Sequence, residues 1–183
     1  MSEEDEKYLD LFPTWLSQLG EDAQLMTNLL RHDGVPDPVV EAVAGGLNYL
    51  FKSLDLIPDG IDDIGYLDDA IVLRVAAAQS LREDLAGVGK EVLQPAVALA
   101  DQCEPIRAFL GEDFARLESY VQGLRQGSAR GRAVADIVRD KTLRAEFISE
   151  VELFSKNYEP PGFAKEQKNL IKLRAFFDAK LPR

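Results

Sequence analysis

The sequence has few of the residues that build common catalytic and metal centres. It contains one cysteine, Cys103, and one histidine, His32. A single cysteine excludes an internal disulfide and any zinc or iron–sulfur site that needs several thiolates, and it fits a reducing compartment. With one imidazole in the chain, a Ser-His-Asp hydrolase is disfavoured, and we expect His32 near a helix end that Gly34 closes.

Phosphate loops, signal peptides and membrane spans are also missing from the sequence. Neither a Gly-Lys-Ser/Thr run nor a Gly-x-Ser-x-Gly run occurs. The first six residues are acidic and lack an apolar core, which argues against a secretory signal, and no uncharged apolar run reaches the roughly 18 residues of a spanning helix. These absences predict a cytoplasmic protein and leave peripheral membrane association as an alternative.

Acidic residues are concentrated in the first part of the chain. The 183 residues have a formal net charge of −11; residues 1–70 contain 16 acidic and 3 basic residues, whereas residues 121–183 contain 8 and 13. Because an acidic surface repels phosphates, we expect no nucleic-acid partner. The length fits one domain. We divide it into an acidic helical core, residues 1–126, and basic C-terminal helices, residues 127–183, packed on the same core.

Apolar residues recur at helical spacing through most of the chain, and no window alternates like a strand. Two amphipathic segments, Pro38–Leu54 and Tyr66–Leu85, are expected to pack together as a helix-turn-helix hairpin. The pair Gly45-Gly46 indicates close approach of a neighbouring helix, and Pro13 is expected to end one short helix or begin the next. The sequence therefore predicts an all-α, single-domain bundle of about seven to nine helices with a central hairpin.

The most distinctive stretch is the acidic turn, residues 55–69, in which six aspartates alternate irregularly with apolar residues. These are Asp55, Asp59, Asp62, Asp63, Asp68 and Asp69. Together with the residues just before it, this stretch resembles the signature of the YkvA-like family, a bacterial domain of unknown function. The matching residues are Tyr49, Leu50, Asp55, Leu56, Ile57, Pro58, Asp59, Ile61, Gly65, Tyr66, Leu67, Asp68 and Asp69.

The resemblance extends over residues 39–78 and implies a short helix-turn-helix unit, without an established activity or substrate. Some members with a more apolar signature look membrane-associated. This chain differs from them, because Ser53 replaces the usual proline, Gly60 replaces a bulky apolar residue, and Asp62-Asp63 replaces a proline and an aliphatic residue. These changes add charge and weaken the membrane inference for this protein.

The aspartates of the acidic turn have two interpretations. In the first, Asp55, Asp59, Asp68 and Asp69 converge from two facing helix ends and bind Mg²⁺, Mn²⁺ or Ca²⁺, with Asp62 and Asp63 as additional candidate ligands. Converging carboxylates repel one another unless a cation neutralises them, and carboxylate oxygens are the ligands that these ions prefer. In the second, the same residues form turns and stabilise helix N-termini. The second interpretation is favoured by how often aspartate occupies such positions.

Three functions follow from these patterns. We expect a non-enzymatic helical interaction or scaffold module with an unknown protein partner, because nucleophile–base pairs and thiol or histidine ligand sets are missing. The first alternative is a divalent-metal-binding protein or metal-dependent enzyme that uses the aspartates. The second is peripheral membrane association through Lys165, Lys168 and Lys172, which lie on one face of the last expected helix, Ala164–Lys180.

Overall fold

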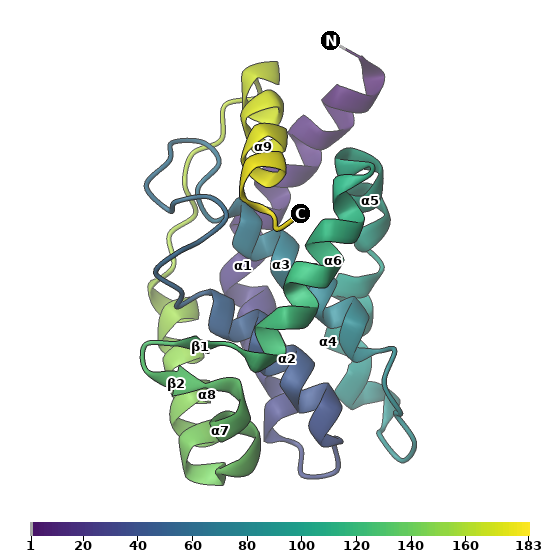
Figure 1. The fold of residues 1–183 in the computed structure, drawn as a ribbon, viewed down its shortest axis with the longest axis vertical. Coiled ribbons are helices and arrows are strands. Elements are labelled where there is room, and N and C mark those ends of the chain that lie inside the picture. Colours follow the sequence, from purple (N-terminus) through teal and green to yellow (C-terminus); the bar gives the residue numbers. More distant parts are fainter. Residues whose placement is uncertain (1) are drawn as a thin grey trace.

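The structure, a computed structural model, describes residues 2–183, and within this range the chain forms nine α-helices, one short 3₁₀-helix and a two-stranded hairpin (Figure 1). The helices are α1 (Glu3–Arg31), α2 (Asp37–Tyr49), α3 (Leu67–Ser80), α4 (Lys90–Ala100), α5 (Cys103–Leu110), α6 (Asp113–Gly123), η1 (Leu124–Gln126), α7 (Val134–Arg139), α8 (Lys141–Asn157) and α9 (Gln167–Lys180). The strands are β1 (Ser128–Ala129) and β2 (Arg132–Ala133). The prediction of an all-α helical bundle is confirmed.

Helix α3 is the centre of the bundle. Every residue of α3 except Ala78 is buried, because α1, α2, α4, α5 and α6 all contact it. A helix that is covered on all sides needs an apolar surface around its whole circumference. The sequence of α3 meets this requirement except at five buried polar positions. Two of them, Gln79 and Ser80, are uncharged and lie at its end, whereas Asp68, Asp69 and Arg74 are charged. These three charged residues therefore need a physical explanation of their own.

The glycine pair of α2 allows two close helix contacts, as its sequence indicates. A Cβ atom at Gly46 would lie 2.5 Å from the Cβ atom of Ala76 on α3, and one at Gly45 would lie 3.1 Å from the backbone of Leu124. Both positions therefore exclude larger side chains. The hairpin of α2 and α3 predicted from the sequence is present, and the contact at Gly46 fixes how closely its two helices approach.

Two expected details are wrong. Helix α1 continues through Pro13 and Gly20 as one helix. Its apolar face is buried on both sides of the proline, so tertiary packing outweighs the local cost of a proline inside a helix. Gly20 lies where the end of α8 packs on α1, and a Cβ there would be 3.2 Å from the carbonyl oxygen of Ser155. The hairpin helices are also shorter than expected.

The glycine-rich segment after α6 contains the β1–β2 hairpin, with Arg130 and Gly131 at positive φ.

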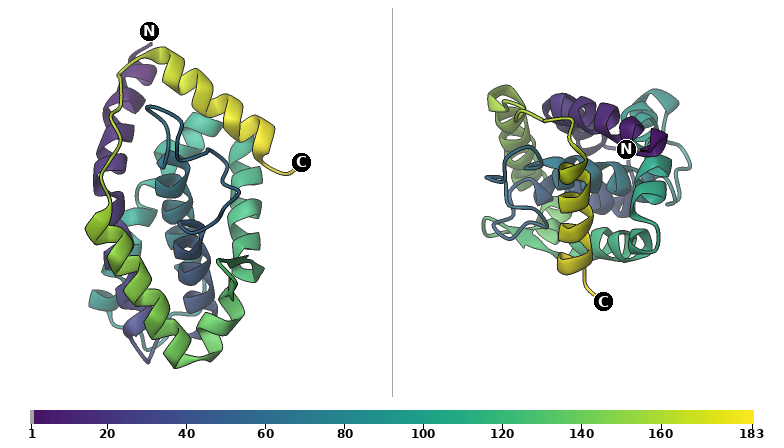
Figure 2. Two further views of the ribbon diagram at one scale, coloured as in Figure 1. Left: turned by 90° about the vertical axis from the view of Figure 1, so that its left-hand side faces the viewer. Right: turned by 90° about the horizontal axis from the view of Figure 1, so that it is seen from above.

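Helix α9 and the start of α1 lie at the same end of the bundle (Figure 2). Helix α9 crosses that end and contacts α1 and α6 (Figure 2). Towards the other end of the bundle, α8 packs on α1 and α7 packs on α2. The loop between α2 and α3 projects from one side of the bundle and faces the viewer in the left panel of Figure 2. The division of the chain at residues 126 and 127 stays a prediction. In the part of the chain from residue 2 onward, no helix is long and apolar enough to span a membrane.

Candidate functional site

The acidic turn lies in the loop between α2 and α3, so Asp55 and Asp59 belong to the loop, whereas Asp68 and Asp69 lie in the first turn of α3. The loop folds into consecutive tight turns. The amide of Gly65 donates to the carbonyl oxygen of Ile61 at 2.8 Å, and a Cβ atom at position 65 would lie 2.2 Å from the carbonyl oxygen of Asp59. Glycine is therefore required there, which explains its place in the signature.

Asp68 joins the loop to α3 through one of its carboxylate oxygens. Its Oδ2 accepts hydrogen bonds from the hydroxyl of Tyr49 at 2.5 Å and from the amide of Ile57 at 3.0 Å. The Tyr49 hydroxyl in turn accepts from the amide of Leu56 at 2.7 Å. All of these groups are buried. Asp68 therefore satisfies backbone groups of the loop, which supports the structural interpretation for this residue and explains why tyrosine and aspartate occur together in the signature.

Three other carboxylate oxygens of the acidic turn have no hydrogen-bond partner among the described residues. They are Asp55 Oδ1, Asp68 Oδ1 and Asp69 Oδ2, and all three atoms are buried. Ion pairs do not compensate them, because none of the salt bridges within residues 2–183 includes Asp55, Asp59, Asp68 or Asp69. Buried polar atoms are almost always hydrogen-bonded, so these three require an explanation beyond helix capping.

Burial and mutual repulsion raise the pKa of each of these carboxyl groups. Burial, followed by the charges of Asp68 and Asp59, raises the pKa of Asp55 to about 7, although Lys52 opposes this. Burial raises the pKa of Asp68 to about 6, against the hydrogen bonds from Tyr49 and Ile57. Asp69 is 3% exposed, and burial together with Asp68, Asp59 and Asp55 holds its pKa well above the ordinary range. The four carboxyl groups therefore lie close enough to act on one another.

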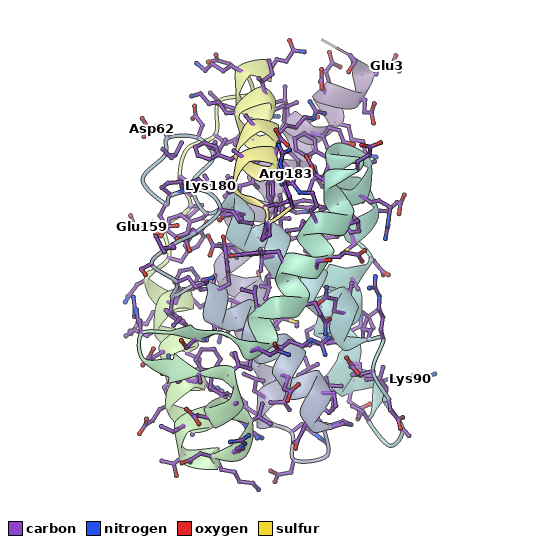
Figure 3. The ribbon with its side chains drawn as sticks, in the orientation of Figure 1. Glu3, Asp62, Lys90, Glu159, Lys180 and Arg183 are labelled. Atoms are coloured by element: carbon purple, nitrogen blue, oxygen red, sulfur yellow. The ribbon has the colours of Figure 1, made fainter. Side chains whose placement is uncertain are left out.

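The remaining two candidates lie outside this cluster. Asp62 is exposed, and Figure 3 shows it pointing away from the bundle. Asp63 Oδ1 accepts a hydrogen bond from the amide of Ala164 at 3.1 Å, which ties the loop to the segment before α9. The charges of Asp55, Asp59, Asp68 and Asp69 thus act on one another, whereas Asp62 and Asp63 lie apart from them. In the conformation described for residues 2–183, no group of three or more His, Cys, Asp or Glu side chains could hold a metal ion. The metal site stays a prediction.

Tyrosines surround the aspartates and connect them to a neighbouring cleft. Tyr120 accepts a hydrogen bond from Lys52 Nζ at 3.3 Å, and burial with the charges of Asp68 and Asp55 raises its pKa to about 12. On the other side, Tyr66 packs edge-to-face on Tyr158 with a centroid distance of 5.5 Å. The pKa of Tyr158 is raised by burial and by Asp69. The Tyr66–Tyr158 pair therefore lies between the acidic turn and the cleft.

This aromatic cleft has a volume of about 430 Å³ and was not predicted from the sequence. Its walls come from the loop, the β1–β2 hairpin and the end of α8, and its lining residues are Phe51, Tyr66, Arg130, Glu150, Leu153, Phe154, Asn157, Tyr158 and Glu159. The one signal in the sequence is the pair Phe154 and Tyr158 at i, i+4 spacing before the proline pair. Because the walls are far apart in the sequence, their meeting could not be inferred from periodicity.

Comparison with known proteins identifies only the region of the acidic turn. The family model described as "Protein of unknown function (DUF1232)" matches residues 41–74, which include most of α2, the loop and the first half of α3. No curated protein and no solved structure matches the chain. The match agrees with the expectation of a domain of unknown function in this region, whereas the YkvA-like identity stays a prediction.

Proposed function

We propose that the protein is a helical interaction module that acts by binding, and that its aromatic cleft binds a basic protein segment with an apolar anchor residue. The observation that supports this proposal best is the exposure of apolar surface at the cleft. Leu153, which lines it, is 58% exposed, although Phe51, Phe154 and Tyr158 beside it are wholly or partly covered. Recessed aromatic surface with an exposed aliphatic residue is typical of sites that bind the side chains of a partner.

The charges around the cleft favour a basic partner. Arg130 lies over the ring of Phe51 at 4.9 Å, and Arg132 lies over Phe147 and donates two hydrogen bonds to Glu150 at 3.0 and 2.7 Å. Arg132 and Glu150 therefore neutralise each other, whereas Arg130 is exposed and keeps its positive charge. Glu159 at the edge of the cleft is exposed, and Figure 3 shows it on the same side of the molecule as Asp62. A lysine or arginine of the partner would pair with Glu159 or Asp62 on this side of the molecule.

Peptide binding tests the proposal directly. The probe is a set of short synthetic peptides in which lysine and arginine flank leucine or phenylalanine at helical spacing, with a matched set in which glutamate replaces every basic residue. We expect the full-length protein to bind the basic set, to bind it more weakly as salt is added, and to lose it in Leu153→Lys. Fluorescence anisotropy measures all three effects.

Leu25→Lys is the matched control, because Leu25 is 42% exposed on α1 and does not line the aromatic cleft. It introduces the same charge elsewhere on the surface and should leave peptide binding unchanged. Equal binding of acidic and basic peptides, or equal loss in the two variants, would contradict the proposal. The cytoplasmic location that suits such a module stays a prediction.

Membrane-surface binding through the C-terminal lysines remains the alternative function. Lys165 pairs with Asp10 at 2.5 Å and Lys168 pairs with Glu166 at 2.7 Å, so two of the three lysines have carboxylate neighbours. Ile171 is 60% exposed next to Lys172, and this observation favours the alternative. It requires that vesicles with anionic lipid pellet the protein more than neutral vesicles do, and that Lys172→Glu removes the difference.

A further inference from the structure

Two charged residues at the edge of the aromatic cleft, Arg130 and Glu159, have no partner of opposite charge among the described residues. Arg130 lies on the β1–β2 hairpin and Glu159 follows α8, and both line the cleft and are exposed. None of the ion pairs within residues 2–183 includes either of them. Glu150, which also lines the cleft, is already paired with Arg132 at 2.7 Å. The cleft therefore presents one unpaired charge of each sign.

The hairpin turn and a neighbouring ring hold Arg130 in place. Arg130 and Gly131 form the two-residue turn between β1 and β2, and both have positive φ, which is 49° at Arg130. Glycine, asparagine or aspartate usually occupies such a position, so an arginine there adopts this backbone at a cost in strain. The guanidinium lies 4.9 Å from the centre of the Phe51 ring. A ring attracts the cation without satisfying its N–H groups, so these stay available to a ligand.

A row of aromatic rings separates the two charges. Phe51, whose ring lies under Arg130, packs edge-to-face on Phe154 with a centroid distance of 6.3 Å, and Phe154 lies 5.4 Å from Tyr158. Tyr158 directly precedes Glu159 in the chain, and the two prolines that follow restrict the backbone of Glu159. The charges therefore stand at opposite ends of an apolar floor, which is where an anchor residue of the partner would lie.

We propose, on the basis of the function proposed above, that the bound segment carries a carboxylate that pairs with Arg130 and a lysine or arginine that pairs with Glu159. Its apolar anchor lies between these two residues and packs on Leu153 and Phe154. A guanidinium binds a carboxylate through two parallel hydrogen bonds, which gives the pair a defined geometry. Charge pairs at the exposed edge of an interface contribute mainly to specificity, because a like charge in either position is repelled. One acidic residue in an otherwise basic segment thus distinguishes the partner.

Four fluorescent peptides test the proposal with the full-length protein. They share one helix-forming sequence with a central leucine and differ only at one position a helical turn before it and one a helical turn after it. These positions carry Glu and Lys, Lys and Lys, Glu and Glu, or Gln and Gln. We expect the unchanged protein to bind the Glu–Lys peptide about two- to fivefold more tightly than the Gln–Gln peptide, and more tightly than either like-charged peptide. Fluorescence anisotropy at low ionic strength measures the affinities.

Reversing either charge in the protein should change which peptide binds best. Arg130→Glu should favour the Lys–Lys peptide, because both charged positions of the cleft are then negative, and Glu159→Lys should favour the Glu–Glu peptide for the opposite reason. Arg139→Glu and Glu146→Lys are the matched controls, since both residues are exposed, lie on α7 and α8 and do not line the cleft. They change the net charge by the same amounts and should keep the preference for the Glu–Lys peptide.

The outcomes separate this proposal from the function on which it rests. Leu153-dependent binding that is equal for the four peptides would overturn the proposal and leave the function intact. The same holds for a preference that Arg130→Glu and Glu159→Lys leave unchanged, or that changes equally in the control variants. If no peptide binds, or if Leu153→Lys leaves binding unchanged, both fail. If Arg130→Glu does not fold, Glu159→Lys decides alone.

Discussion

Helix α3 contains two sets of buried charged residues, Arg74 in its middle and Asp68 with Asp69 in its first turn. The two sets differ in whether their polar atoms are hydrogen-bonded. In its middle, the guanidinium of Arg74 is 0% exposed and fully paired: it donates to Asp22 Oδ2 at 3.0 Å, to Gln102 Oε1 at 2.9 Å and to the carbonyl oxygen of Ala70 at 2.9 Å. The ring of Trp15 covers it at 4.5 Å. In its first turn, Asp68 and Asp69 are equally buried but keep unpartnered oxygens.

The difference teaches how to interpret buried charge in this fold. A charge whose donors are all satisfied by neighbouring helices joins those helices, and the residues around Arg74 come from α1, α3 and the segment after α4. A buried charge without partners destabilises the folded protein. A bound ligand or a proton that neutralises the charge would remove this cost, and it is therefore the physical explanation to test for such a residue. The predictions below test whether the two regions of α3 differ in this way.

The largest effect is expected for Arg74→Ala. Truncation leaves Asp22 and Gln102 without their partner and opens a cavity beside Trp15, so the free energy of unfolding should fall by about 3–5 kcal/mol. Chemical denaturation with near-ultraviolet circular dichroism measures it. Arg82→Ala is the control, since Arg82 forms an ion pair with Glu118 at the surface and its loss should cost about 1 kcal/mol or less. Similar losses in both variants would remove the distinction between the two regions.

Tyr49→Phe is expected to have the next largest effect. It deletes the hydrogen bond to Asp68 and leaves the buried amide of Leu56 without an acceptor, so we predict a loss of about 2–3 kcal/mol, measured in the same way. Tyr120→Phe keeps the aromatic ring of that residue and removes a hydroxyl that accepts a hydrogen bond from Lys52, and it should cost less, because no buried backbone amide loses its acceptor. If Tyr49→Phe is as stable as the unchanged protein, Asp68 does not join the loop to α3.

Local sequence patterns were sufficient to predict the helical class, the α2–α3 hairpin and the glycine contacts. Helical periodicity can be recognised from residues that are neighbours in the sequence. The close approach at Gly46 is possible because glycine has no side chain, so the residue type alone indicates it. The convergence of Asp55, Asp59, Asp68 and Asp69 on a cation stays a prediction. The elements expected to carry these aspartates were partly wrong. The sequence placed them at two facing helix ends, whereas α2 ends at Tyr49 and Asp55 and Asp59 lie on the loop.

Features that depend on distant segments could not be predicted in this way. Nothing near Pro13 in the sequence shows that Phe109 of α5 will pack on Phe12 beside it. Arg74 likewise gives no local sign that Asp22 and Gln102 will reach it. The aromatic cleft has the same origin, because its walls come from residues near positions 51, 130 and 154. A charged residue within an apolar helical pattern, as at Arg74, was the one usable signal of a buried ionic network.

The acidic turn should make the protein less stable as the pH rises, in chelator-treated buffer. Burial raises the pKa of Asp55 to about 7 and that of Asp68 to about 6, and holds the pKa of Asp69 well above normal. Between the ordinary carboxyl range and about pH 7 the folded state therefore binds more protons than the unfolded state, so the free energy of unfolding falls as pH rises through this window. Denaturation at about pH 5 and about pH 8 measures the effect.

Asp69→Asn should remove much of that pH dependence. Asparagine cannot ionise, so the variant should be more stable than the unchanged protein by about 1 kcal/mol or more at about pH 8, and nearly equal to it at about pH 5. This sign is the reverse of that expected for Arg74→Ala. Destabilisation at both pH values would indicate that the Asp69 carboxylate has a stabilising partner, and the contrast between the two regions of α3 would fail.

The smallest effect is expected for Asp62→Asn, which tests whether position in the acidic turn is sufficient for these properties. Asp62 lies between the clustered aspartates in the sequence, but it is exposed and points to solvent (Figure 3). Its substitution should change the free energy of unfolding by no more than about 0.5 kcal/mol at either pH. A larger, pH-dependent change would mean that the loop brings Asp62 toward α3 in solution. The unusual behaviour would then belong to the whole acidic loop rather than to the carboxylates that α3 buries.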